Sequence, residues 1–295
     1  MAEKKSARAV ALTVLLQIEK EQAYANLALQ KELKARKLNK LDNAFVTRLV
    51  YGVEQNKSYL DHILSGFLQK PLSELPLPIL LILRLGIYQL VCLDKIPAHA
   101  AINECVKLAK KYGHPGIIRL VNGVLRNVER KKGKIELPLW PKQAEDYLVL
   151  KESHPRFLVR RLLAELDPEE ALAFCCSNNE PAPVAVRVNT LRISREDLVA
   201  LWQEKGIPTQ KSSWSKDGLL LAKSAAIKEL PGYQEGFFTI QDISSQLAAL
   251  ALNPQEGSQV LDLCAAPGGK STHMAQLMHN KGQIYAFDVY EHKIK

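Results

Sequence analysis

The sequence contains few cysteines, and their spacing argues against two common ways of stabilising a protein. Only five of the 295 residues are cysteine, which is an odd number, and no two of them form a CxxC pair. This usage argues against a disulfide framework and a zinc site, and it favours a reducing compartment. The histidines also lack the spacing of metal ligands. We therefore expect no bound metal and a cytoplasmic protein.

Long apolar runs are also missing. The most apolar stretch, PILLILRLGIYQLVCL (78–93), contains Arg84 and Gln89. It is too short and too polar to span a membrane, so it predicts a buried helix. Near the N-terminus, Thr13 and Gln17 interrupt the apolar residues, which argues against a signal peptide. We expect a globular protein, a monomer, with no membrane partner.

The positive charge is concentrated in the first half of the chain. The net charge is +9, but residues 1–140 carry 23 Lys or Arg against 12 Asp or Glu, so the remainder is slightly acidic. A basic module next to a near-neutral one suggests a polyanionic partner for the first module. A solvated helical surface would have the same composition, so charge alone leaves both interpretations open.

Residues 1 to about 130 have the periodicity of amphipathic helices. In AAINECVKLAKKYG (100–113) the apolar residues fall on one stripe with lysines opposite, and IIRLVNGVLRNVERK (117–131) repeats the pattern. The simplest assembly is an all-helical bundle, which we assign to residues 1–135. The basic, proline-containing segment that follows predicts a linker at 136–145.

Residues 146–236 predict a small α+β domain. The segments that carry this prediction are a strand in PVAVRVNTL (183–191), a helix in SREDLVALWQEKG (194–206), and short strands in DGLLLAK (217–223) and GFFTIQD (236–242). We expect the aromatic side chains of this domain to pack in its core, namely Phe174, Trp202 and Trp214.

Residues 237–295 predict the beginning of a Rossmann-like α/β domain. The expected elements are a helix at 244–252, a strand at 260–264, a glycine-containing loop, a helix at 271–278 and a strand at 283–289. Such a βαβ unit normally joins two parallel strands. Two strands alone leave an apolar edge and an open face, so we expect the last ~50 residues to be weakly stabilised.

Two ligand classes compete for the loop in VLDLCAAPGGKST (260–272). The phosphate loop of nucleotide triphosphatases, GxxxxGK[ST], would require glycine where this chain has Cys264. A nucleoside ligand fits better, because Gly268 and Gly269 permit a close backbone approach and a helix N-terminus follows. Asp288 ends the next strand, where a carboxylate can accept hydrogen bonds from ribose hydroxyls.

The motif DLCAAPGGKSTHMAQLM resembles the S-adenosylmethionine motif of the RNA cytosine-5 methyltransferases (the NOL1/NOP2/Sun family). The segments GFFTIQDISSQLAAL and RVNTLRIS are similar to the parts of that family that precede the motif. The helical half, with IPAHAAINECVKLAKKYG and RLVNGVLRNVERKK, resembles a NusB-type RNA-binding module. The resemblance extends along essentially the whole chain.

The resemblance implies S-adenosyl-L-methionine as the cofactor and cytosine C5 of 16S ribosomal RNA as the methylated site. Asp262 would support the loop, and Lys270 could pair with the cofactor carboxylate. The residues implied to bind the cofactor are Cys264, Ala265, Ala266, Pro267, Gly268, Gly269, Lys270 and Asp288.

The resemblance assigns no catalytic residue to this chain. In the family, a cysteine thiolate attacks C6 of the base and a second cysteine assists, and both lie beyond the position of Lys295. The alternative is a non-catalytic RNA-binding protein of the antitermination type.

RNA contact by the helical half would use basic helix faces. The candidates are Arg8, Lys34, Arg36, Lys37, Lys107, Lys110, Lys111, Arg119 and Arg126.

Overall fold

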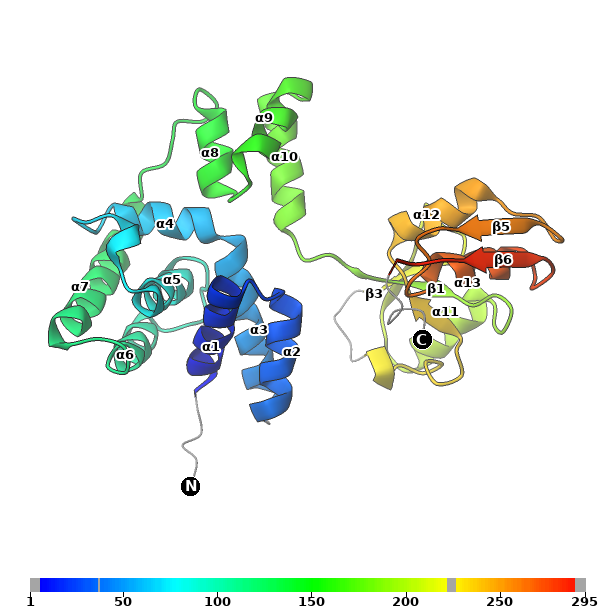
Figure 1. The fold of residues 1–295 in the computed structure, drawn as a ribbon, viewed down its shortest axis with the longest axis horizontal. Helices are drawn as coiled ribbons and strands as arrows, with labels where there is room; N and C mark the ends of the chain where they lie inside the picture. The colour runs from blue at the N-terminus through cyan, green and yellow to red at the C-terminus, as the bar shows by residue number, and fades with distance from the viewer. Residues whose placement is uncertain (1–5, 37, 222–226, 290–295) are drawn as a thin grey trace. The chain divides into compact units, whose positions relative to one another are not determined.

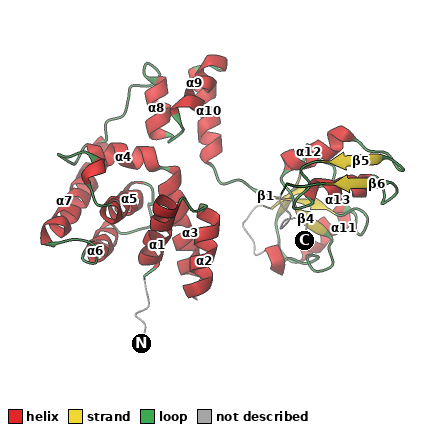
Figure 2. Ribbon diagram, viewed as in Figure 1, coloured by secondary structure: helices red, strands yellow, loops and turns green. Residues whose placement is uncertain are grey.

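The computed structural model describes residues 6–36, 38–221 and 227–289, and the chain divides into two units after Glu180 (Figure 1). The first unit is built from helices, as the sequence predicts for residues 1–135 (Figure 2). Its α-helices are α1 (Ala7–Glu21), α2 (Ala25–Arg36), α3 (Lys40–Gln55), α4 (Lys57–Ser65), α5 (Leu77–Val91), α6 (Ala98–Ala109), α7 (Pro115–Lys131), α8 (Ala144–Lys151), α9 (Arg156–Glu165) and α10 (Pro168–Asn179).

Helix α5 is the centre of the first unit's core. It lies within the most apolar stretch of the sequence, and α1, α3, α4, α6 and α7 all contact it. Every residue from Leu81 to Leu90 is buried, including Arg84 and Gln89. Gly86 lets α7 approach closely, because a Cβ there would lie 2.6 Å from Leu125. Among the described helices, none is both long and apolar enough to cross a membrane.

Arg84 is the charged residue that this apolar helix buries. Its guanidinium donates two hydrogen bonds to Asp61 of α4, at 2.7 and 2.8 Å, and a third to Glu19 of α1 at 3.2 Å. Lys57 also bonds to Glu19. The ion-pair network therefore ties three helices together through one buried cation.

Helices α8 to α10 belong to the first unit by their contacts. The Ser153 hydroxyl accepts a hydrogen bond from the backbone of Tyr59 at 3.1 Å, and Gln55 donates to the Asn179 carbonyl at 2.8 Å. Lys151 lies 4.3 Å from the centre of the Tyr59 ring. The sequence analysis instead places residues 146–236 in the α+β domain, whereas the contacts divide the chain after Glu180. The domain limits at residues 135, 146 and 236 remain predictions.

The second unit begins with a four-stranded antiparallel sheet of order β2-β3-β1-β4. The elements of this part are β1 (Val184–Val188), α11 (Arg195–Glu204), β2 (Thr209–Lys211), β3 (Gly218–Leu221) and β4 (Phe238–Ile240). Ser194 caps α11 through a 3.0 Å bond to the Asp197 amide. The sequence predicts three of the strands and misses β2, which has only three residues.

The aromatic residues expected in the core divide into two groups. Trp202 of α11 is fully buried and packs edge-on against Phe238 of β4. Trp214 is 76% exposed and Phe174 is 43% exposed, so the expectation was wrong for both. Trp214 lies in the turn between β2 and β3, where Ser212 accepts its backbone N–H, and Phe174 lies on an outward part of α10.

The rest of the second unit is a parallel strand pair with two helices. Its elements are α12 (Ile243–Leu252), β5 (Gln259–Asp262), α13 (Gly269–Leu277) and β6 (Gln283–Ala286), and β5 pairs with β6 in parallel as predicted. A small core holds them together, formed by Ala249, Val260, Met274 and Met278. The opposite face of the pair is exposed and apolar, at Leu261, Leu263, Tyr285 and Phe287.

We predict that Arg84→Met lowers the free energy of unfolding of the first unit by about 3–5 kcal/mol, because it leaves Asp61 partly buried without its cation and leaves Glu19 paired with Lys57 alone. Urea unfolding followed by far-ultraviolet circular dichroism measures the change. The control is Lys107→Met, which breaks a solvent-exposed ion pair with Glu104 and should change stability by less than ~1 kcal/mol. Equal effects of the two variants would contradict the prediction.

Candidate functional site

The loop of residues 263–268 connects β5 to α13 beside the end of β6. The Asp262 carbonyl accepts the Phe287 N–H at 2.8 Å, and the Phe287 carbonyl accepts the Ala265 N–H at 2.8 Å. These two bonds continue the parallel pairing past the last ladder residue. The loop and the residues after β6 are therefore fixed against each other.

Asp262 joins the beginning of the loop to the first turn of α13. One carboxylate oxygen accepts the Cys264 N–H at 3.2 Å, and the other accepts the Ser271 hydroxyl at 2.6 Å. This single half-buried acid therefore contacts both sides of the loop. The contacts are those of a residue that supports the loop's shape.

Asp288, the acid predicted to bind ribose, lies against the loop. Its carboxylate accepts the Ala266 N–H at 3.2 Å. The structure thus brings together residues that are 22 positions apart in the sequence. Whether Asp288 also contacts a sugar remains a prediction.

Gly268 makes the turn from the loop into α13. Its φ of +97° is in the left-handed region that favours glycine, and it occupies the N-cap position without a side-chain cap. The Gly268 N–H bonds to the Ala265 carbonyl at 2.6 Å, and its own carbonyl accepts the Thr272 N–H at 2.9 Å. Helix α13 begins two residues earlier than predicted because the chain enters it directly from this turn.

Open space lies over the two glycines. A Cβ on Gly268 would meet no atom within 4 Å, and one on Gly269 would meet only the Gln241 side chain, at 3.8 Å. The first amides of a helix have no acceptor within it and attract anions. Lys270, in the same turn, is exposed. A ligand with a carboxylate could therefore reach backbone donors here without a steric clash.

The four cysteines outside the loop lack the environment of a nucleophile. Burial raises the pKa of Cys92 to about 11, that of Cys105 to about 12 and that of Cys175 to about 11. Burial and Glu152 also raise the pKa of Cys176. All four remain protonated thiols at neutral pH, and the thiolate is the reactive form. Cys264 is exposed in the loop.

The basic residues predicted to contact RNA are only partly available. Lys107, Lys110 and Lys111 are exposed at the end of α6, and Arg119 and Arg126 are exposed on α7, as is Lys34 on α2. Arg8 and Arg36 are half-buried and bond to Gln89 and Glu32, and the exposed Lys107 and Arg126 also bond to Glu104 and Asn122. Lys37 lies outside the described residues.

The sequence reasoning missed a buried arginine next to the loop. Arg187 of β1 is 3% exposed, and its guanidinium bonds to Thr272 in the first turn of α13. Its position in an alternating strand pattern gives it the appearance of a solvent-facing residue. The signal available in the sequence was a set of three glutamines, Gln241 just after β4, Gln246 on α12 and Gln276 on α13, which are all buried here.

Three protein families match successive parts of the chain. Residues 5–130 match the NusB family, residues 154–228 match the RsmF/B-like methyltransferase ferredoxin-like domain, and residues 249–295 match the family described as 16S rRNA methyltransferase RsmB/F. A protein of Bacillus subtilis called probable ribosomal RNA small subunit methyltransferase B is 40% identical over 99% of this chain. The chain belongs to the RsmB/F family.

Other RsmB/F relatives give the same picture. The Synechocystis protein of the same name is 37% identical over 96% of this chain. The chain spans 64% of the length of the Bacillus subtilis protein and 63% of the Synechocystis protein. The crystal structure of PH0851 matches the whole chain with a TM-score of 0.71 at 23% identity, and the chain covers 65% of it. That likeness supports the shared fold.

We predict that Gly268→Ala destabilises the second unit of this RsmB/F chain by about 1–2 kcal/mol, because a Cβ disfavours a positive φ even where space is free. The neighbouring Gly269→Ala is the matched control. Gly269 lies in the helix and has room for a Cβ, so this change should be nearly neutral. Urea unfolding of the two variants measures the difference, and equal stabilities would show that the turn does not require glycine.

Proposed function

We propose that this chain is the RNA-binding and cofactor-binding part of an S-adenosyl-L-methionine-dependent methyltransferase that modifies cytosine C5 in 16S ribosomal RNA. The observation that carries the proposal is the loop of residues 264–270, which is held open beside Asp288 at a helix N-terminus. Membership of the RsmB/F family supports methyl transfer to ribosomal RNA. The position on the base rests on the resemblance of the loop motif.

The residues of the loop fit the chemistry of this cofactor. When bound, S-adenosylmethionine supplies an electrophilic methyl group on a sulfonium centre. Its amino-acid carboxylate suits the amides at the start of α13 and the charge of Lys270. The backbone from Cys264 to Gly269 would lie along the methionine and adenosine parts, and the space over Gly268 permits this approach.

Asp288 would bind the ribose of the cofactor. A carboxylate has about four acceptor positions, so a bond such as the one from the Ala266 N–H does not by itself prevent contact with sugar hydroxyls. The same bond orients the carboxylate toward the loop. In this arrangement Asp262 supports the loop instead, because one of its oxygens bonds to the loop at Cys264 and the other bonds to α13 at Ser271.

The first unit would supply RNA contacts through exposed lysines and arginines of α6 and α7. Phosphate contacts position an RNA without selecting a base, so these residues would raise affinity rather than choose the cytosine. We assign no catalytic nucleophile to a cysteine of this chain. The proposal places the protein in the cytoplasm, where ribosomal RNA is modified.

Calorimetry with S-adenosylhomocysteine tests the cofactor site. We expect the wild-type chain to bind it, and Asp288→Asn to weaken binding by about tenfold, because one charge-assisted hydrogen bond contributes ~1.4 kcal/mol or more. Glu229→Gln removes an exposed carboxylate from the same unit and is the control. If the folded wild-type chain does not bind, the non-catalytic RNA-binding alternative is favoured.

The RNA surface is tested by reversing three charges on one helix end. We expect Lys107→Glu, Lys110→Glu and Lys111→Glu together to weaken binding to a 16S ribosomal RNA transcript. Losing two or three phosphate contacts should also lower the slope of log affinity against log salt by about 2. Reversal of Lys205, Lys228 and Lys281 alters the net charge equally and is the control. Unchanged binding at low salt in the first variant would remove this surface from the proposal.

A further inference from the structure

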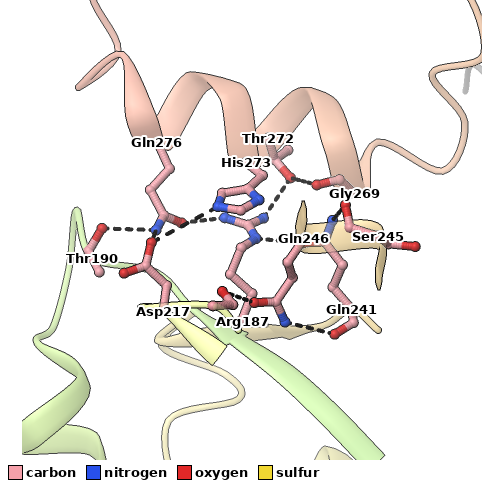
Figure 3. Close-up of polar contacts among 11 residues, drawn as sticks. Arg187, Thr190, Asp217, Gln241, Ser245, Gln246, Gly269, Thr272, His273 and Gln276 are labelled. Atoms are coloured by element: carbon pink, nitrogen blue, oxygen red, sulfur yellow. Dashed lines mark hydrogen bonds and ion pairs between the residues drawn. The ribbon is translucent and has the colours of Figure 1, made fainter. Parts of the chain in front are cut away.

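Arg187 is buried and bonds to three uncharged side chains (Figure 3). Its Nε donates to Gln241 Oε1 at 2.7 Å, its Nη1 donates to Gln276 Oε1, and its Nη2 donates to the Thr272 hydroxyl at 3.0 Å. Gln241 follows β4, whereas Thr272 and Gln276 lie on α13. The arginine of β1 therefore joins the four-stranded sheet to the helix that follows the glycine loop.

The Thr272 hydroxyl connects Arg187 to Gly268 through two hydrogen bonds. Its hydroxyl oxygen lies 2.8 Å from the Gly268 carbonyl oxygen and accepts the hydrogen bond from Arg187 on another side. A guanidinium can only donate, so the hydroxyl must accept from it and directs its own proton to a carbonyl. The bond to Gly268 is thus oriented by the charge of Arg187.

Gln241 brings a second partner of Arg187 to the other glycine. Its side-chain nitrogen lies 3.8 Å from where a Cβ of Gly269 would be. The same side chain accepts the Arg187 bond through its oxygen, and this fixes which end of the amide faces the glycine. Both glycines of the loop therefore lie next to a group that Arg187 holds in place.

Arg187 is a cation at neutral pH in spite of its burial. Burial lowers the pKa of Arg187 to about 10, and Asp217 opposes this shift. His273, which is fully buried on α13, has a pKa lowered to about 4 by burial and by Arg187. It is neutral above pH 5 and adds no second positive charge.

We infer that Arg187 is a positioning residue for the cofactor loop and acts through Thr272 and Gln241 on Gly268 and Gly269. This inference rests on the proposed function, since it takes the loop as the binding site for the adenosyl cofactor. Arg187 itself touches no part of the proposed ligand site. Its role is to set the backbone that the ligand contacts.

Thr272→Val tests the inference by removing one hydroxyl. Valine has nearly the same shape and helix preference but can neither accept from Arg187 nor donate to Gly268. We expect the dissociation constant for S-adenosylhomocysteine to rise about tenfold, which corresponds to ~1.4 kcal/mol. Without ligand, hydrogen exchange should become faster at the amides of Ala265, Ala266 and Gly268. Thr272→Ser keeps the hydroxyl and should restore both properties.

Val199→Ala is the control for general destabilisation, because Val199 packs against the same sheet from α11. It should change neither ligand affinity nor loop exchange. If Thr272→Val behaves like wild type in both measurements, or if Val199→Ala has the same effect, the inference is wrong. If the wild-type chain binds no S-adenosylhomocysteine, the proposed function fails, and loop exchange in the ligand-free variants still decides the role of Arg187.

Discussion

The second unit depends on the burial of one guanidinium. A buried charge is tolerated only when its hydrogen-bonding groups are satisfied, and Arg187 finds its acceptors on the segment after β4 and on α13. Helix α13 must therefore lie where its threonine and glutamine reach β1. Because the glycine loop leads directly into α13, the same requirement places the loop.

Apolar packing alone would hold this loop weakly. The core beneath β5 and β6 is formed by four buried residues, and the opposite face of the strand pair is exposed. The first unit contrasts with this, because α5 is surrounded by helices and its buried arginine is paired with two carboxylates. In the second unit, directed polar bonds contribute a larger share of what fixes the site, and directed bonds specify orientation better than non-directional burial does.

The sequence predicts the loop better than it predicts what supports it. Glycines after a strand, a following helix and an acid at the next strand end are local signals, and the structure brings residues 264–270 and Asp288 together. Arg187 was missed because strand alternation assigns every second residue to solvent, whereas residues 185–188 are all buried under other elements. Trp214 shows the opposite error, since its apolar character suggested the core, but it lies in a turn whose backbone amides bond to the Ser212 hydroxyl, and its side chain is exposed.

Gln276 of α13 lies between the charges of Arg187 and Asp217, and it couples the packing of α13 to the four-stranded sheet. Gln276 accepts from Arg187 and donates to Asp217, at 3.0 Å, and it also donates to Thr190 at 2.9 Å. A direct ion pair between Arg187 of β1 and Asp217, which precedes β3, would satisfy both charges within the sheet and leave α13 out. With an amide inserted between them, each charge is satisfied only when α13 is in place. The attraction between two sheet residues thereby stabilises the helix that carries the loop, and any displacement of α13 would leave a buried cation and a buried carboxylate without their shared partner.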